Sequence, residues 1–482
     1  MNVIRIAAAA LVALLALTSC KKILNSGGDD SFHIRLVNLI QDSPTVQYKI
    51  DTTIVGNAGY QAGTALAPAR PGDHPISFQA IRPTSLVSTD TTDPIDLTGS
   101  FSRTYTKNTD YTIFAYGKLA NIQTLITEAP SGQAAVVDDN IELTVINAAV
   151  AQPMLTVYVT VPNAGINSPQ SIGTIGPGQK TTASTMKLTR PANSTDTTSD
   201  LTSPLTFEIH DASGAVILTS VALTVTEKTR YLFVITPNIG PGPSPVQVIA
   251  IDGTSGVFTN TADQAEIRVV HASAATPAFD VYRATSLGAP MVSNLAFRDR
   301  SNYVSVPEGT IDLLGVPAGS TGLQFLFIRE SLVTQGTSTS AYVIGPAGSV
   351  VAAIEGDNRR SVPTQASYRF LSAPPSQVGQ LGLDVYVTTP GLALDFTAAT
   401  SVTTDDAPQF RQATGLVYSN ITDYATLKPA TYQVRVMTTG TTTVLLDTTI
   451  TLQPGGVTTY VINDDPDTGA LELVPVEDAA TT

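Results

Sequence analysis

The sequence is poor in the residues on which metal sites, disulfides and charged interfaces depend. Among 482 residues there are one Cys, no Trp and four His, and only 14% are Asp, Glu, Lys or Arg. A single Cys excludes an internal disulfide and a Cys-based zinc site. The sparse charge, against roughly 25% in an average soluble domain, excludes a charge-rich disordered chain and a coiled coil.

The charge that is present is mainly acidic. Lys and Arg total 26 and Asp and Glu total 40, so the formal net charge is −14. Because phosphate contacts need clustered cations, we expect no nucleic-acid partner. The 42% of hydrophobic residues is enough to bury real cores. At roughly 100–200 residues per domain, the length predicts about three to five domains.

The first twenty residues predict export and lipid attachment. A short basic start precedes an unbroken apolar run at residues 6–17. That run fits the core of a signal peptide and is shorter than the roughly 20 residues of a spanning helix. Residues 17–20, Leu-Thr-Ser-Cys, resemble the bacterial lipobox. We therefore expect Cys20 to be lipidated; the alternative is an ordinary signal peptide with a chance Cys.

Cleavage before Cys20 would remove the signal peptide at residues 1–19 and leave residues 20–31 as a lipidated tether. Loss of Arg5 would take the formal net charge from −14 to −15. Two or three acyl chains would hold the new N-terminus in the membrane, since one chain binds only marginally. Lys21 is not the Asp that resembles an inner-membrane retention signal, so we expect the outer membrane of a bacterial cell envelope. The sequence is compatible with both the periplasmic face and the surface face of that membrane.

One strand–turn–strand motif recurs four times. Each copy is a β-branched run, then a turn with Pro and small residues, then a second run that ends in Tyr. The copies begin at Ile34, Ile141, Ile267 and Tyr368. About seven strand-like segments per copy, with frequent turn signals and almost no helical periodicity, are typical of a two-sheet sandwich.

The sequence therefore predicts an all-β chain of four tandem immunoglobulin-like β-sandwich domains. The expected domains are residues 32–135, 136–262, 263–363 and 364–482.

The third copy carries the most specific pattern. A strand leads to His-Ala-Ser at 271–273, then to Asp-Val-Tyr at 280–282, and later to Tyr303 before a Val-Pro and Gly turn. This stretch resembles the family known as domain of unknown function 4397. The fourth copy keeps Asp-Val-Tyr at 384–386, whereas Gln47 and Thr156 replace the Asp in the first two. The resemblance implies an extracytoplasmic bacterial protein of tandem sandwiches and attaches no biochemical role.

His271 and Asp280 are the most tempting catalytic pair, because a His and an Asp can act as a base and its orienting carboxylate. In the other copies Asn38, Asn147 and Ser372 replace the His. Such side chains bond to nearby backbone, which favours a turn-capping role. The remaining His33, His74 and His210 have no metal-ligand spacing. We expect no catalytic, metal or cofactor-binding residue.

Three further motifs resemble functional sites. Residues 173–181 fail as a phosphate loop, because Gln179 separates the second Gly from Lys180. The acidic segments 88–93 and 194–200 lack the Asp spacing of a calcium loop and are expected to be solvated. Asp-Thr-Thr resembles an O-glycosylation sequon of some periplasmic systems, which would make acceptors of Thr52, Thr91, Thr197 and Thr448.

Taken together, these features predict a non-enzymatic, lipid-anchored cell-envelope protein with a structural, adhesive or binding-scaffold role. We expect it to act as a rod or spacer that presents loops. Its partners would be the membrane, through Cys20, and an envelope protein or polysaccharide. The alternative is a glycan- or partner-binding accessory of an outer-membrane complex, although the lack of Trp weakens the case for sugar binding. An enzymatic function is the least favoured hypothesis.

Overall fold

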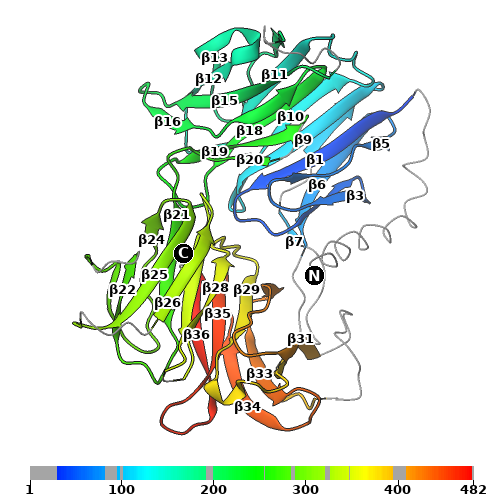
Figure 1. Ribbon diagram of the computed structural model, residues 1–482. Coiled ribbons are helices and arrows are strands. Elements are labelled where there is room, and N and C mark those ends of the chain that lie inside the picture. Colours follow the sequence, from blue (N-terminus) through cyan, green and yellow to red (C-terminus); the bar gives the residue numbers. More distant parts are fainter. Residues whose placement is uncertain are drawn as a thin grey trace.

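The computed structural model describes residues 30–81, 95–97, 101–190, 199–253, 256–283, 288–320, 326–346, 348–394 and 409–479. These residues form strands β1 to β36 and two three-residue 3-10 helices, η2 (Pro162–Ala164) and η3 (Pro375–Gln377) (Figure 1). The predicted all-β fold is confirmed. Cys20, Thr91 and Thr197 lie outside the described residues.

The strands form four two-sheet sandwiches in chain order. Sandwich 1 contains β1 (Phe32–Ile40), β2 (Val46–Ile50), β3 (Thr53–Ala58), β4 (Ala62–Gly63), β5 (Ala67–Ala69), β6 (Gly72–Ala80), β7 (Ile95–Asp96), β8 (Phe101–Tyr105), β9 (Thr109–Lys118) and β10 (Asn121–Pro130). Sandwich 2 contains β11 (Asn140–Asn147), β12 (Leu155–Val161), β13 (Ile166–Ile175), β14 (Ser184–Lys187), β15 (Thr202–His210), β16 (Val216–Thr219), β17 (Leu223–Thr226), β18 (Thr229–Pro237), β19 (Val246–Asp252) and β20 (Gly256–Phe258).

The two C-terminal sandwiches have fewer strands. Sandwich 3 contains β21 (Ala265–His271), β22 (Phe279–Arg283), β23 (Val292–Leu295), β24 (Val304–Val306), β25 (Gly309–Pro317), β26 (Leu326–Val333), β27 (Ser338–Ile344) and β28 (Val351–Asp357). Sandwich 4 contains β29 (Ala366–Ser372), β30 (Leu383–Thr388), β31 (Gln409–Leu416), β32 (Ala425–Leu427), β33 (Thr431–Thr438), β34 (Val444–Thr451), β35 (Val457–Asp464) and β36 (Leu471–Ala479).

All four sandwiches share one topology. In each, the first strand runs parallel to a late strand: β1 beside β9, β11 beside β18, β21 beside β27 and β29 beside β35. We call the sheet that contains this parallel pair the pairing sheet. The other ladders are antiparallel. In sandwich 3, for example, Ile267 and Val269 of the pairing sheet enter one core with Leu313 of the second sheet.

The pairing sheets are apolar on both faces, because alternate residues of a strand point to opposite sides. In β1, Leu36 enters the core of sandwich 1, whereas Val37 and Leu39 enter a second cluster with Ile146 and Val234 of sandwich 2. Sandwiches 1 and 2 therefore pack face to face as the N-terminal pair.

Sandwiches 3 and 4 pack in the same way as the C-terminal pair, through a cluster that contains Val270, Tyr342, Leu371 and Val461. Figure 1 shows β1 to β20 in the upper half of the view and β21 to β36 in the lower half. The expected rod is therefore wrong: the units are paired side by side instead of being strung end to end.

The two pairs also touch each other through Arg360, in the segment between β28 and β29. Its Nε donates to the carbonyl oxygen of Gln41 at 2.9 Å, and its Nη2 donates to that of Ser43. The guanidinium carbon lies 4.3 Å from the centroid of the Tyr60 ring. Sandwich 1 thus holds the linker that joins sandwiches 3 and 4.

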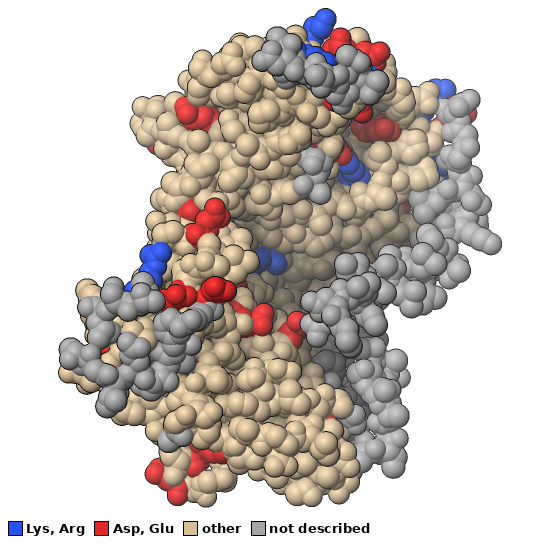
Figure 2. Space-filling view, in the orientation of Figure 1, with Lys and Arg blue, Asp and Glu red and all other residues tan. Residues whose placement is uncertain are grey.

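Figure 2 shows a surface that is mostly uncharged, with scattered acidic side chains, as the composition requires. None of the helices in the described ranges is both long enough and apolar enough to cross a membrane.

Candidate functional site: the faces between paired sandwiches

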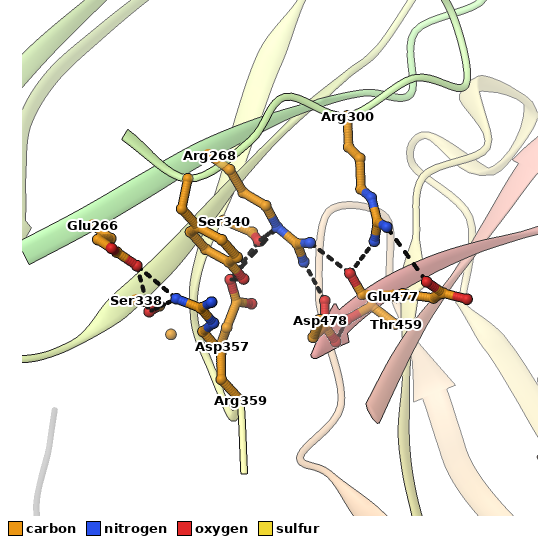
Figure 3. Close-up of polar contacts among 12 residues, drawn as sticks. Glu266, Arg268, Arg300, Ser338, Ser340, Asp357, Arg359, Thr459, Glu477 and Asp478 are labelled. Carbon is orange, nitrogen blue, oxygen red and sulfur yellow. Dashed lines mark hydrogen bonds and ion pairs between the residues drawn. The ribbon is translucent and has the colours of Figure 1, made fainter. Parts of the chain in front are cut away.

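The C-terminal pair buries two arginines between its sandwiches. Arg268 of β21, drawn in Figure 3, and Arg369 of β29 are each 2% exposed, and both lie on the faces of the pairing sheets that meet. In each strand the Arg follows a core residue and precedes another, so its side chain points away from its own core and toward the neighbouring sandwich.

Arg268 bonds within its own sandwich and across the interface. Its Nε donates to Ser340 Oγ at 2.7 Å, and its Nη1 donates to the carbonyl oxygen of Glu477 at 2.6 Å. Its Nη2 donates to Asp478 on β36. The guanidinium carbon lies 4.8 Å from the centroid of the Tyr303 ring. We call Arg268, Tyr303 and Asp478 the Arg268 triad.

Arg369 repeats this pattern in the opposite direction. Its Nε donates to Thr459 Oγ1 at 2.8 Å, and its Nη1 donates to the carbonyl oxygen of Gly356, also at 2.8 Å. Its Nη2 donates to Asp357 Oδ1 at 2.6 Å, and its guanidinium carbon lies 4.2 Å from the Tyr424 ring centroid. Arg369, Tyr424 and Asp357 form the Arg369 triad, related to the first by a pseudo-two-fold exchange of the sandwiches.

The two triads share their carboxylates. Asp357 Oδ2 accepts from Tyr303 Oη at 2.7 Å, and Asp478 Oδ2 accepts from Tyr424 Oη at 2.7 Å. Two guanidinium groups and two carboxylates thus neutralise one another in a buried site. Burial alone would lower the pKa of Arg268, but the charges of Asp478 and Asp357 outweigh it and the net shift is upward. The arginines therefore stay charged, which ties the network to a single pairing geometry.

The described part of the N-terminal pair keeps one arginine–carboxylate pair of this kind. Arg35 of β1 donates from Nη1 and Nη2 to the two carboxylate oxygens of Asp252 on β19, at 2.7 and 2.5 Å. Its Nε donates to Thr112 Oγ1 at 3.0 Å, as Arg268 does to Ser340. Across the pseudo-two-fold axis, Thr144 occupies the position of the second arginine, since it pairs with Leu232 as Arg369 pairs with Thr459.

A pocket of about 410 Å³ lies between sandwiches 1 and 2 at this place. Arg35, Asp252 and Thr144 line it, together with residues of β9, β10 and β18. A second bidentate ion pair stands in its wall: Arg230 donates to the two carboxylate oxygens of Glu142, at 3.0 and 3.1 Å. The interface between sandwiches 1 and 2 is therefore both charged and open.

The structure places His271 in a structural role. It is fully buried between Phe279 and Phe297, with ring centroids 4.6 and 5.9 Å away. Its Nδ1 accepts from the backbone N–H of Ser273 at 3.3 Å. Burial lowers its pKa, so the ring is neutral near pH 7. Asn147 does the same in sandwich 2, accepting from the N–H of Ala149 at 2.9 Å, which agrees with the turn-capping interpretation.

Asp280 is not a partner of His271. Its carboxylate accepts from the backbone N–H groups of Asn294 at 2.7 Å and Gly319 at 3.2 Å, so it closes loops of the second sheet. Asp384 has the corresponding role in sandwich 4, accepting from the N–H of Gly415 at 2.9 Å. His271 and Asp280 are therefore not assembled as a base and its orienter.

The other motifs that lie within the described residues fall on turns and edges, whereas residues 88–93 and 194–198 lie outside them. Residues 173–181 run from the end of β13 toward β14, and a strand follows where a phosphate loop needs a helix. Thr52 is exposed at the β2–β3 turn, and Thr448 is half-buried on β34. His33 and His74 bond Asp110 and Asp51, and His210 bonds Glu208. Within the described ranges no group of three or more His, Cys, Asp or Glu residues could hold a metal ion.

The strands that begin the four copies were predicted from the sequence, but a role for Arg35, Arg268 and Arg369 within them was not. An available signal was the recurrence of Arg between two core-facing apolar residues in three of the four copies. A charged residue in the middle of an apolar strand needs a buried partner.

Comparisons with known proteins give weak structural neighbours. The tip fimbrial protein Mfa3 from Porphyromonas gingivalis is 9% identical, covers 46% of this chain and 99% of its own, and has a TM-score of 0.16. The TIE protein of Bacillus anthracis is 8% identical, with coverages of 91% and 74% and a TM-score of 0.15. A streptococcal ancillary pilin is 10% identical, with coverages of 68% and 100% and a TM-score of 0.13. Scores this low support no inference about role.

No curated protein matches the chain. The model of the family "Domain of unknown function (DUF4397)" matches residues 32–158, 265–377 and 382–482, which is well over half of the chain. These matches include the third and fourth copies of the motif and confirm the resemblance drawn from residues 267–317. With its repeated sandwiches, the chain belongs to the DUF4397 family.

Proposed function

We propose that this chain is a lipid-anchored protein of the bacterial cell envelope that acts without catalysis, as a scaffold for structural or adhesive contacts. The observation that carries the scaffold role is the reciprocal network of Arg268, Arg369, Asp357 and Asp478. A buried set of paired charges contributes little net stability, because desolvation offsets the attraction between the charges. It does penalise every other arrangement of the two sandwiches, and so it gives a rigid block.

Rigid blocks suit a protein that presents loops. Each pair fixes two sandwiches relative to one another, and Arg360 links the second pair to the first. Loops at the sandwich ends are then held at defined spacings, which lowers the entropic cost of binding a partner at several points.

The anchor in this proposal is Cys20, supported by the apolar run at 6–17 and the Leu-Thr-Ser-Cys that follows it. Intact-mass spectrometry of the chain recovered from envelopes tests it. We expect loss of residues 1–19 and added acyl mass on Cys20, and we expect Cys20→Ala to release the chain from the membrane. Recovery of an exported, unacylated wild-type chain would contradict the anchor.

The second candidate function is a glycan- or partner-binding accessory of an outer-membrane complex. The pocket between sandwiches 1 and 2 is the observation that favours it, since a concave site of this size lies in the range of small-molecule sites.

A further inference from the structure

The pocket of the N-terminal pair occupies the place where the C-terminal pair has its Arg369 triad. Strand register gives the equivalent residues. In sandwich 4, Tyr368 pairs with Ala425, so Arg369 faces Tyr424. In sandwich 2, Leu143 pairs with Ser184, so Thr144 faces Ala183.

The carboxylate of the triad has an equivalent too. Asp357 pairs with Ser338. Two residues later on the same strand, Ser340 faces Arg268. In sandwich 1, Ala129 pairs with Asp110. Two residues later on the same strand, Thr112 faces Arg35. Arg369, Tyr424 and Asp357 are thus replaced by Thr144, Ala183 and Ala129, and all three of these line the pocket.

The remaining arginine–carboxylate pair, Arg35 with Asp252, also lacks the tyrosine of the C-terminal triads. Leu66 stands opposite Arg35 where Tyr303 stands opposite Arg268, because Ala67 pairs with Ile34 as Val304 pairs with Ile267. Leu66 lines the same pocket and is 45% exposed. Four positions carry Arg, Tyr, Asp and Tyr in the C-terminal pair and the smaller residues Thr, Ala, Ala and Leu in the N-terminal pair. The space is therefore built by the sequence at a fixed place, beside an ion pair that holds the two sandwiches together.

The walls indicate the chemistry of the occupant. Arg35 is already paired with Asp252 and Arg230 with Glu142, each in bidentate geometry. With Lys180, Asp110 and Glu128 included, three cationic and four anionic side chains line the pocket, so its charges nearly cancel and favour neither a strongly anionic nor a strongly cationic ligand. A neutral ligand with many hydroxyl groups can instead use the free lone pairs of the carboxylates and the hydroxyls of Thr112 and Thr144. Leu66 and Pro130 add apolar surface of the kind on which the C–H face of a sugar ring packs.

We propose that the pocket between sandwiches 1 and 2 binds a neutral saccharide. This inference deepens the second candidate function and is independent of the lipid anchor, so either can fail without the other. The site needs no Trp, because its polar groups come from the interface ion pairs and its apolar contacts from Leu66 and Pro130.

Titration calorimetry and saturation-transfer NMR on the purified full-length chain test the proposal. The neutral probes are maltotriose, cellotriose, mannotriose and chitotriose. The charged probe is trigalacturonic acid, and the peptide probe is tetraglycine. We expect saturable binding of at least one neutral probe and none of the charged probe or the peptide.

Two variants refill the pocket. Ala183→Tyr places one aromatic side chain in it at an exposed position, and Thr144→Arg with Ala183→Tyr and Ala129→Asp rebuilds the missing triad. We expect at least a tenfold loss of affinity in Ala183→Tyr, and in the triple variant if it folds. Ala215→Tyr, at an exposed turn of sandwich 2, is the matched control and should bind as the wild type does.

Three results would overturn the proposal. One is that no neutral probe binds the wild-type chain. Another is that binding survives Ala183→Tyr in a folded protein. The third is that trigalacturonic acid or tetraglycine binds in preference to every neutral probe, which would assign the pocket to a charged glycan or to a peptide.

Discussion

Arg369 of sandwich 4 donates a 2.6 Å hydrogen bond to Asp357, the last residue of the final strand of sandwich 3. Arg268 and Asp478 make the reverse bond from sandwich 3 to sandwich 4. Asp478 is 210 residues from Arg268 along the chain and Asp357 only 12 from Arg369, but each carboxylate belongs to the other sandwich. Both bonds therefore require the two sandwiches to be docked.

Removing one carboxylate of the buried network should lower the stability of the C-terminal pair of sandwiches. Asp357→Ala leaves Arg369 buried with an uncompensated charge, and we expect a loss of about 3–5 kcal/mol in the free energy of unfolding. By the pseudo-two-fold relation, Asp478→Ala should lose a similar amount. Urea denaturation followed by the near-ultraviolet signal of the tyrosines measures both losses.

A control variant and a rescue variant accompany the measurement of these losses in the free energy of unfolding. Asp447→Ala removes an ion pair with Arg435 on the open side of sandwich 4, where Asp447 is 47% exposed, and should change stability by less than about 1 kcal/mol. Combining Asp357→Leu with Arg369→Met should recover much of the loss. Equal losses for Asp357→Ala and Asp447→Ala would show that the buried network does not hold the pair together.

Gly178 of sandwich 2 should accept a side chain only at a cost in stability, because it lies against Tyr116 of sandwich 1. Its φ is 72°, in the left-handed region, and an added Cβ would meet the hydroxyl of Tyr116. We expect Gly178→Ala to lower the stability of the N-terminal pair by about 1–3 kcal/mol. Gly214 has a φ of 84° with open space around it, so Gly214→Ala measures the backbone strain alone.

Adding Tyr116→Phe to Gly178→Ala removes the hydroxyl that obstructs the Cβ. The double variant should regain the part of the loss that exceeds the loss in Gly214→Ala. A double variant as unstable as Gly178→Ala would mean that the contact between Gly178 and Tyr116 is not what limits the substitution. Thermal unfolding of the full chain supplies the comparison.

Sandwich 3 should become less stable in mild acid because of His271. Burial lowers the pKa of its imidazole, so the unfolded chain binds a proton more readily than the folded one does. The stability from the neutral ring is complete above about pH 6.5 and is lost as the pH falls, by at most about 1.4 kcal/mol per pH unit. Denaturation curves between pH 7.5 and pH 5 measure this slope.

His271→Asn provides the control for that slope, because Asn38 and Asn147 cap the equivalent turns. The variant should fold and should show a flatter pH dependence over the same range. A slope unchanged by the substitution would assign the acid sensitivity to other groups.

The contact between the two pairs should depend on Arg360. Arg360→Ala removes its bonds to the carbonyl oxygens of Gln41 and Ser43 and its stacking on Tyr60. We expect several-fold faster amide hydrogen exchange at residues 41–43 and 60, with the sandwich cores unchanged. Arg359→Ala is the adjacent control, because Arg359 bonds Glu266 within sandwich 3. Equal effects of the two variants on residues 41–43 would contradict this role.

The sequence predicted the repeated sandwiches because one strand–turn–strand motif recurs from Ile34, Ile141, Ile267 and Tyr368, with turn signals between the strand-like segments of each copy. It did not predict the pairing, because residues such as Val37 and Val270 look the same whether they enter a core or an interface. The pocket could not be predicted either. Thr144, Ala183 and Ala129 are unremarkable until strand register sets them against Arg369, Tyr424 and Asp357.

Small-angle X-ray scattering tests the face-to-face pairing most directly, on exported chain made lipid-free by Cys20→Ser. The paired arrangement predicts a radius of gyration within a few ångström of the roughly 23 Å expected of a compact chain of this length. It also predicts a pair-distance distribution with a single main peak. A rod-like profile with a much larger radius would contradict the account.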